Sequence, residues 1–210
     1  MKKRNSSAIP DTERFADRGV ALEDLATHFV VHCPKCQGKA QINPTKEPAS
    51  KADFRLICPD CFHVESPGHW YGAATAHVSV KCRECYQPLS RSAPWNGIWK
   101  KLAMHCTHCG DNCEYEASIS YGYFHESRMT DPIFGLPLWL QKDFRGELLW
   151  AYNYDHLEML REYITAKLRE RGIDPRNTIR KNSSMVSRLP MFIKKASLRE
   201  ELLKLIATMK

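Results

Sequence analysis

The segment FVVHCPKC, residues 29–36, holds the first of four C-x-x-C pairs and decides how the first half of the chain is organised. DFRLICPDC at 53–61, HVSVKCREC at 77–85 and KLAMHCTHC at 101–109 repeat the arrangement, in which a strand-like run leads into two cysteines. The first cysteines of successive pairs lie 25, 24 and 24 residues apart. This regular spacing identifies an internal repeat.

The repeated pairs have the chemistry of metal ligands. Two thiolates separated by two residues can bind one ion from a tight turn, or knuckle, and two knuckles complete a tetrahedral site. Thiolates select zinc or iron over magnesium and calcium. The sequence therefore predicts two structural zinc ions, held by Cys33, Cys36, Cys58, Cys61, Cys82, Cys85, Cys106 and Cys109. Because a site closed by four cysteines has no open position for water or substrate, we expect the zinc to hold the fold.

Two pairings of the knuckles remain open. Consecutive pairing joins residues 33–61 and 82–109 into two separate sites, whereas alternating pairing makes a cross-brace. The second and fourth knuckles are followed by similar strand-like stretches, and the other two by turn-rich segments. This difference favours consecutive pairing and a repeat of about 49 residues. Cys113 is left over, either as a small buried thiol, which we favour, or as an alternative ligand in a C-x2-C-x3-C motif.

HCPKCQG, ICPDCFH and HCTHCGD resemble the knuckles of zinc ribbons of the rubredoxin and transcription-factor-IIB type. The whole chain is also similar to uncharacterised bacterial proteins with a zinc-ribbon front and a helical tail carrying an LWAYN-type motif, here residues 149–153. Zinc ribbons occur in proteins that bind DNA, RNA or other proteins, so the likeness implies no single activity. Gln37, Phe62 and Tyr86 depart from the glycine that usually follows a knuckle, and only Gly110 matches it.

Composition narrows the class of protein. The 210 residues are 43% hydrophobic and 26% charged, as in globular proteins. No apolar run approaches the length of a membrane span, and the polar N-terminus lacks the apolar core of a secretory signal. We therefore expect a cytoplasmic protein, in which nine cysteines bind metal in preference to forming disulfides.

The second half of the chain has helical signals and lacks cysteine after residue 126. Apolar residues recur at helical spacing over roughly 156–171, where Asp155 is the expected cap, and over roughly 198–209. The expected fold is a small α+β protein, with two tandem zinc ribbons of short antiparallel strands followed by a small helical C-terminal domain. The expected parts are a flexible N-terminal arm (1–27), a first ribbon (28–76), a second ribbon (77–126), a Trp/Pro-rich joint (127–153) and a basic helical tail (154–210).

Large apolar residues gather in the joint, namely Trp139, Phe144, Leu148 and Trp150. Such residues supply either core or an aromatic surface for a partner or for stacked bases. We favour core, because large aromatic side chains usually provide burial.

Charge is divided unevenly along the chain. Residues 1–160 contain 18 Lys/Arg and 19 Asp/Glu, whereas residues 161–210 contain 13 and 5. A concentrated basic stretch is the expected footprint of phosphate contacts, which predicts nucleic-acid binding by Arg176, Arg180, Lys181, Arg188, Lys194 and Lys195. DNA and RNA are both open as partners. Nothing indicates a membrane surface or a small-molecule substrate.

Other functions remain as alternatives. One is a protein–protein adaptor that docks on a larger nucleic-acid or regulatory machine, and a lesser one is a rubredoxin-like electron carrier with iron in place of zinc. The phosphate-binding loop, nucleophile elbow and H-E-x-x-H motifs are missing from the sequence. His63 and Glu65, with Cys82 and Cys85 downstream, match part of a zinc deaminase pattern, but Lys81 replaces its proline. We therefore expect no enzymatic activity.

Overall fold

The computed structural model describes residues 14–47, 49–95, 97, 99–125, 127–170 and 184–210. The chain divides into two compact units. The cysteine unit is Val30–Trp139, and the terminal unit combines Met1–Phe29 with Leu140–Lys210. The first thirteen residues of the predicted N-terminal arm lie outside the described residues.

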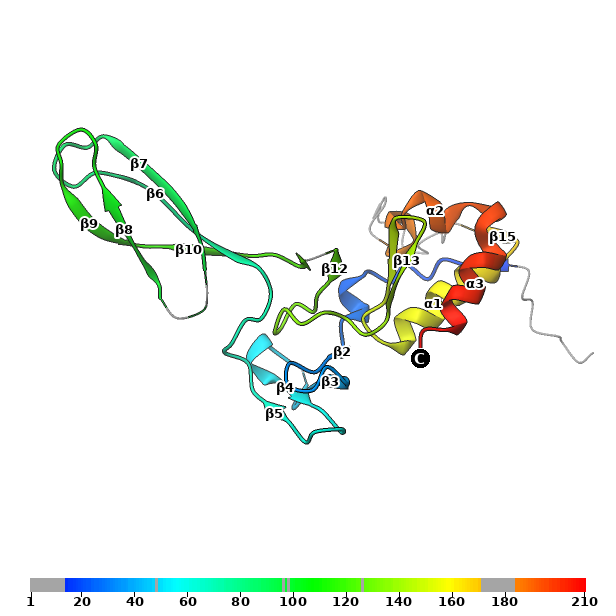
Figure 1. The fold of residues 1–210 in the computed structure, drawn as a ribbon. Helices are drawn as coiled ribbons and strands as arrows, with labels where there is room; N and C mark the ends of the chain where they lie inside the picture. Colours follow the sequence, from blue (N-terminus) through cyan, green and yellow to red (C-terminus); the bar gives the residue numbers. More distant parts are fainter. Residues whose placement is uncertain (1–13, 48, 96, 98, 126, 171–183) are drawn as a thin grey trace, which may run out of the picture. The chain divides into compact units, whose positions relative to one another are not determined.

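The predicted fold class, α+β with a helical C-terminal domain, is wrong. Within the described ranges the chain is mostly β, with fifteen strands in small sheets and three short α-helices (Figure 1). Strands also form in segments expected to be joint or helix. For example, Arg145 and Gly146 both take positive φ, 57° and 82°, and close a tight hairpin. Such two-residue turns fit the twist of antiparallel strands.

The first sheet of the cysteine unit has the strand order β2-β3-β4-β5. Its strands are β2 (Phe29–His32), β3 (Lys39–Pro44), β4 (Phe54–Ile57) and β5 (Val64–Glu65). Apolar and polar residues alternate along β3 and β4, so that Ile42 and Leu56 are fully buried and pair directly. This alternation is what a sheet with one solvated face requires.

A second group of strands holds the third and fourth knuckles. One sheet has the order β10-β6-β7, and the other pairs β8 with β9. The bounds are β6 (Ala74–Lys81), β7 (Pro88–Pro94), β8 (Lys101–His105), β9 (Asn112–Glu116) and β10 (Ser118–Tyr121). Their inner faces share a small core of Val78, Leu102, Met104 and Tyr115.

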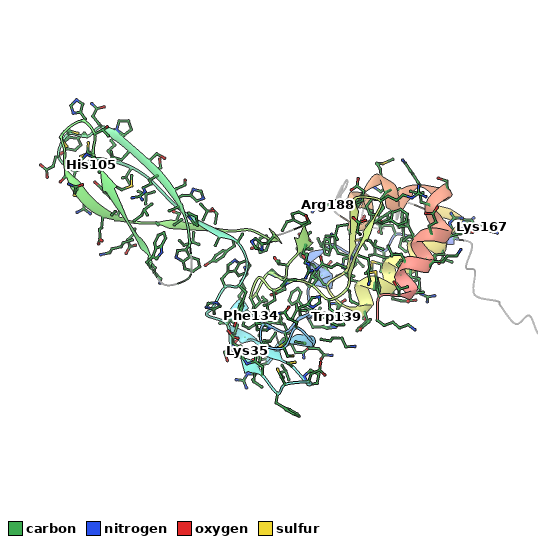
Figure 2. The ribbon with its side chains drawn as sticks, in the orientation of Figure 1. Lys35, His105, Phe134, Trp139, Lys167 and Arg188 are labelled. Atoms are coloured by element: carbon green, nitrogen blue, oxygen red, sulfur yellow. The ribbon has the colours of Figure 1, made fainter. Side chains whose placement is uncertain are left out.

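The rest of the cysteine unit contains a hairpin of β11 (Phe124–His125) and β12 (Arg128–Met129), and a loop built around Asp131. The fully buried Asp131 carboxylate accepts backbone N–H hydrogen bonds from Ile133 (2.8 Å), Phe134 (2.7 Å) and Leu136 (2.7 Å). Burial raises the pKa of Asp131 to about 6, although these donors act in the opposite direction. The loop buries Phe134 completely (Figure 2).

The terminal unit contains the hairpin of β13 (Gln141–Phe144) and β14 (Glu147–Trp150). Its helices are α1 (Tyr154–Thr165), α2 (Met191–Lys194) and α3 (Arg199–Ala207). Strands β1 (Arg14–Ala16) and β15 (Leu168–Glu170) pair in parallel. The remaining short 3-10 helices are Glu23–Leu25, Val186–Arg188 and Ala196–Leu198, with another at Lys51–Asp53 in the cysteine unit.

Helices α1 and α3 lie side by side, and both are shorter than the sequence predicted (Figure 1). The guanidinium of Arg199 donates hydrogen bonds to the carbonyl groups of Ile164 (2.8 Å) and Ala166 (3.0 Å). These carbonyls would otherwise lack partners at the end of α1. In the part of the chain that the structure describes, no helix is long and apolar enough to cross a lipid bilayer.

Candidate metal centres

Each of the four C-x-x-C knuckles lies at the turn of a β-hairpin, and all four turns share one backbone pattern. The hairpins are β2/β3, β4/β5, β6/β7 and β8/β9. In each knuckle the N–H of the first cysteine donates to the carbonyl five residues later, at 2.8–2.9 Å. These bonds run from Cys33 to Gly38, from Cys58 to His63, from Cys82 to Gln87 and from Cys106 to Asp111.

The residue after each second cysteine takes a left-handed conformation. The φ values are 62° at Gln37, 57° at Phe62, 60° at Tyr86 and 80° at Gly110. The missing glycines therefore do not change the turn, and three knuckles adopt it with a side chain that normally disfavours it. The strain is compensated by the rest of the hairpin.

Consecutive pairing is the arrangement that the structure shows. Cys33, Cys36, Cys58 and Cys61 form one group, and Cys82, Cys85, Cys106 and Cys109 form the other. Within each group all four sulfur atoms lie within 4.8 Å of one another, and the shortest Sγ–Sγ separations are 3.5–3.6 Å. A tetrahedral zinc site with bonds of about 2.3 Å places its sulfurs about 3.8 Å apart. Each group can hold a metal ion, and this donor set fits zinc.

Backbone N–H groups surround the sulfurs and favour the thiolate form. The N–H groups of Cys109 and His108 lower the pKa of Cys106 to about 6. At Cys58 burial acts against ionisation, but the N–H groups of Cys61 and Asp60 lower its pKa to about 7. Hydrogen bonds that fix the ligating atoms in this way are typical of metal sites.

One further sulfur in each group is harder to ionise. The N–H of Gly38 acts to lower the pKa of Cys36, but burial and the neighbouring thiols raise it to about 12. The pKa of Cys109 is raised to about 12 in the same way, against the N–H of Asp111. Four thiolates in such a small volume repel one another, so a bound cation is what allows all four to ionise.

Cys113 belongs to neither group. Its thiol donates a hydrogen bond to the Asp111 carboxylate at 2.9 Å, and this bond raises the pKa of Cys113. The leftover cysteine is therefore placed as a half-buried thiol beside the second group, and its sulfur is turned to a carboxylate.

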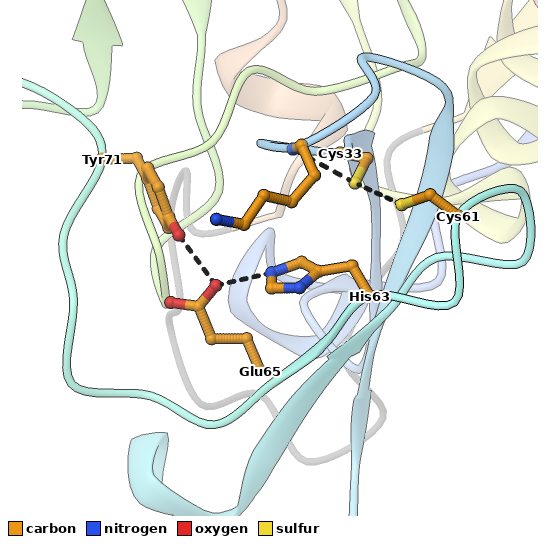
Figure 3. A network of polar contacts seen from close by, with 6 residues as sticks. Cys33, Cys61, His63, Glu65 and Tyr71 are labelled. Carbon is orange, nitrogen blue, oxygen red and sulfur yellow. Dashed lines mark hydrogen bonds and ion pairs between the residues drawn. The ribbon is translucent and has the colours of Figure 1, made fainter.

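His63 and Glu65 take part in a polar network next to the first group (Figure 3). The Glu65 carboxylate accepts hydrogen bonds from Nε2 of His63 (2.9 Å) and from the hydroxyl of Tyr71 (2.7 Å). Burial and the Glu65 carboxylate raise the pKa of Tyr71 to about 12. A deaminase-like site would need His63 beside Cys82 and Cys85, but neither cysteine group includes His63. The network ties β5 to the segment that follows it.

The predicted nucleic-acid contacts are only partly described. Arg176, Arg180 and Lys181 lie outside the described residues. Arg188 and Lys195 are exposed on the terminal unit, and Figure 2 labels Arg188. Lys194 is half-buried and its ammonium donates to the carbonyl of Ser187 at 2.8 Å. Lys194 thus has a structural hydrogen bond that the sequence did not indicate.

The large residues of the predicted joint are packed. Phe144 is buried and stacks on Phe192, with ring centroids 5.9 Å apart, and Trp150 contacts His156. Trp139 lies against His32 at 4.7 Å. Among the described residues the exposed aromatic side chains lie outside the joint, at Phe62, Tyr86, Tyr121, Tyr123, Phe124 and Tyr154. Three of them come from the run YGYF at residues 121–124, and this run is their only sequence signal.

Comparison with known proteins gave no match, since no protein-family model, no curated protein and no solved structure matches this chain. The likeness to zinc ribbons therefore depends on the knuckle sequences alone, and the case for metal binding depends on the geometry of the cysteine groups.

Proposed function

We propose that this chain is a non-enzymatic nucleic-acid-binding protein whose two cysteine groups hold structural zinc. The observation that carries the proposal is the charge distribution, since the entire positive excess falls in residues 161–210. Lys and Arg in such a stretch neutralise phosphates and release counterions, which gives affinity without base specificity. The closed cysteine groups support a structural role for the metal.

The exposed cations of the terminal unit support this assignment. Arg188 and Lys195 are exposed and follow the basic stretch that contains Arg180 and Lys181. Phosphate contacts need accessible cations on long side chains and do not need a preformed pocket. The proposal therefore assigns phosphate binding to the terminal unit.

The test is fluorescence anisotropy of the zinc-loaded protein with labelled single-stranded DNA, duplex DNA and RNA over a range of salt concentrations. Replacing Arg180, Lys181, Arg188 and Lys195 by Gln should weaken binding to all three. On duplex DNA the slope of log affinity against log salt should become shallower by up to about 0.9 for each phosphate that the variant no longer neutralises.

A matched control variant removes the same number of positive charges from the cysteine unit and leaves the terminal unit unchanged. Lys35, Lys51, Arg55 and Lys101 are exposed residues of the cysteine unit, and replacing them by Gln removes the same four charges. This variant should retain most of the affinity and salt slope. Equal loss of affinity in both variants would mean that net charge alone drives binding, and absence of binding at low salt would refute the proposal.

One observation favours the second candidate, a protein–protein adaptor. Ile57, Phe62 and Val64 expose 43%, 86% and 53% of their side chains, and Ile57 pairs directly with Val64 across β4 and β5. Exposed apolar residues gathered on one hairpin are typical of protein interaction sites. Stable co-purification of one protein, abolished on replacing Ile57 and Phe62 by Ser, would favour this function.

A further inference from the structure

Three aromatic side chains within four residues are exposed at the end of strand β10. Tyr121, Tyr123 and Phe124, called here the aromatic segment, have exposed fractions of 42%, 43% and 57%. Single exposed apolar residues are common on protein surfaces, but neighbouring exposed rings mark a place where another molecule binds. None of the three belongs to the buried core of the cysteine unit.

Trp70 packs against two rings of the aromatic segment. Its ring lies 4.8 Å from that of Tyr121 and 6.0 Å from that of Tyr123, between centroids, with interplanar angles of 59° and 82°. Its indole N–H donates to the carbonyl of Ala73 at 3.1 Å. Tilted and edge-to-face contacts of this kind hold rings in fixed orientations.

The position of Trp70 is fixed in turn by two glycines that lie close to its ring. A Cβ atom on Gly135 would lie 2.7 Å from the Trp70 ring, and one on Gly72 would lie 3.1 Å from its Nε1 atom. The indole therefore packs directly on glycine backbone, where no larger residue fits. The backbone of Tyr123 is held as well, because its carbonyl accepts from the N–H of Thr130 at 2.9 Å. The aromatic segment is thus presented on a prearranged support.

The strands that lead into the aromatic segment carry no negative charge that would repel a nucleic-acid backbone. Strands β6, β7 and β10 contain no Asp or Glu. His77 pairs with Ser118 on one side and Ser92 on the other, and these residues are exposed together with Ser79 and Lys81. These side chains lie on the face of the sheet opposite to Tyr121, which pairs with Ala74 three residues before His77. On the next hairpin Arg128, also exposed, pairs with His125 beside Phe124.

We infer that the aromatic segment stacks the unpaired bases of a single-stranded nucleic acid, and that Arg128 contacts a phosphate of the same strand. A cation beside exposed rings suits a base with its phosphate, and an apolar protein partner would leave the guanidinium without a bond. A duplex keeps its base faces stacked inside, so only a single strand can offer them. This inference rests on the proposed function and specifies its ligand.

The test compares labelled oligo-dT with the same strand in a duplex, using the full-length zinc-loaded protein at fixed salt. Oligo-dT should bind more tightly than the duplex. Tyr123→Ala with Phe124→Ala should weaken oligo-dT binding on the order of 20-fold, about fivefold per ring, and should leave duplex binding and the salt slope unchanged. Both rings are exposed, so the variant should fold, as zinc content and circular dichroism would verify.

Phe62→Ala with Tyr86→Ala is the matched control, because these rings are exposed at knuckles and do not belong to the group of rings that Trp70 holds. The control should bind oligo-dT like the wild type. Equal binding of single strand and duplex, or an equal loss of affinity in the control, would overturn the inference and leave the proposed function in place. Absence of binding to any nucleic acid would overturn both.

Discussion

Asn153 joins the start of helix α1 to the N-terminal part of the terminal unit. Its Oδ1 atom accepts from the N–H of His156 at 2.9 Å and so caps the helix. Its amide N–H groups donate to the carbonyls of Leu25 (2.8 Å) and His28 (3.0 Å). The side chain is fully buried, so each of these bonds replaces one that water cannot supply.

Asn153→Ala should therefore lower the free energy of unfolding of the terminal unit by about 3 kcal/mol, since it removes a cap and leaves two buried carbonyls without donors. Urea unfolding followed by circular dichroism measures the change. Asn153→Ser keeps an oxygen that can cap the helix but lacks the two N–H donors. It should therefore be only about 1 kcal/mol more stable than the Ala variant. A loss below about 0.5 kcal/mol in the Ala variant would contradict this role.

His156 makes the stability of the terminal unit depend on pH. Burial lowers its pKa from 6.5 to about 4, and its Nδ1 atom accepts from the N–H of Tyr152 at 3.3 Å. In the unfolded chain the ring takes up a proton near its ordinary pKa, whereas the folded ring stays neutral. Its stabilising contribution is therefore fully present above about pH 6.5 and is lost as pH falls towards 4, by up to about 3 kcal/mol.

Hydrogen exchange of the α1 amides, corrected for intrinsic rates, should show this loss of stability between about pH 6.5 and 4.5. The cysteines lie in the other unit, so exchange at α1 separates the effect of His156 from that of the metal. His156→Phe cannot be protonated and should have a flatter profile in the same window. An identical slope in both proteins would show that another group titrates.

The four knuckles are equivalent hairpin turns, although their sequences differ at the left-handed position. Gly110→Ala should cost about 1 kcal/mol, since an added Cβ atom has open space and meets only the backbone penalty. Tyr86→Gly, at φ 60° in the other knuckle of the same group, should relieve a similar strain. Glycine adds entropy to the unfolded chain, so the net gain should be smaller than the cost at Gly110.

Zinc affinity measured by competition with a chelator reports these changes, because metal binding and folding are coupled in small sites. We expect the Gly110 variant to bind zinc about fivefold more weakly and the Tyr86 variant to bind as tightly as the wild type or better. If Gly110→Ala had no effect while Tyr86→Gly weakened binding, the ring of Tyr86 and not its backbone would matter.

The cysteine spacing, a local signal, predicted the knuckles. The end and the cap of helix α1 depend on contacts between residues far apart in the sequence, and the sequence did not predict them. The cysteine spacing specified two groups because each knuckle is a short turn between neighbouring strands. Helix α1 ends at Thr165 and not near 171, because Arg199 from a distant segment binds its last carbonyls. Its cap is Asn153 and not the predicted Asp155, because Asn153 also bonds residues 25 and 28.

The sequence also could not predict which aromatic side chains are exposed. The run at Tyr121–Phe124 and the joint at Trp139–Trp150 are both rich in large rings, yet only the first is exposed. Which ring is covered depends on packing partners such as Phe192, which lies far from Phe144 in the sequence. Periodicity could therefore predict the metal ligands and could not locate the exposed surface.

The two units of the molecule differ in what stabilises them. The strands of the second cysteine group share four buried core residues, a small core for about fifty residues. The terminal unit has no cysteine and buries many more apolar side chains, among them Leu149, Leu160, Ile164 and Leu202. Small sheets with little apolar burial usually need a metal or disulfides to fold, whereas a packed helical core does not.

Metal removal should consequently unfold the cysteine unit and leave the terminal unit folded. A strong chelator should abolish the protection of backbone amides from hydrogen exchange in β3, β4, β6 and β8. The four sulfur atoms of each group lie within 4.8 Å of one another and would then have no cation to hold them together. Helices α1 and α3 should stay protected, because Arg199 and the core between these helices do not involve metal. Replacing Cys58 and Cys106 by Ser in the zinc-loaded protein should reproduce the pattern without a chelator. Retained protection in the cysteine unit would show that its hairpins fold on apolar burial alone, and simultaneous loss of protection in both units would show that they fold as one.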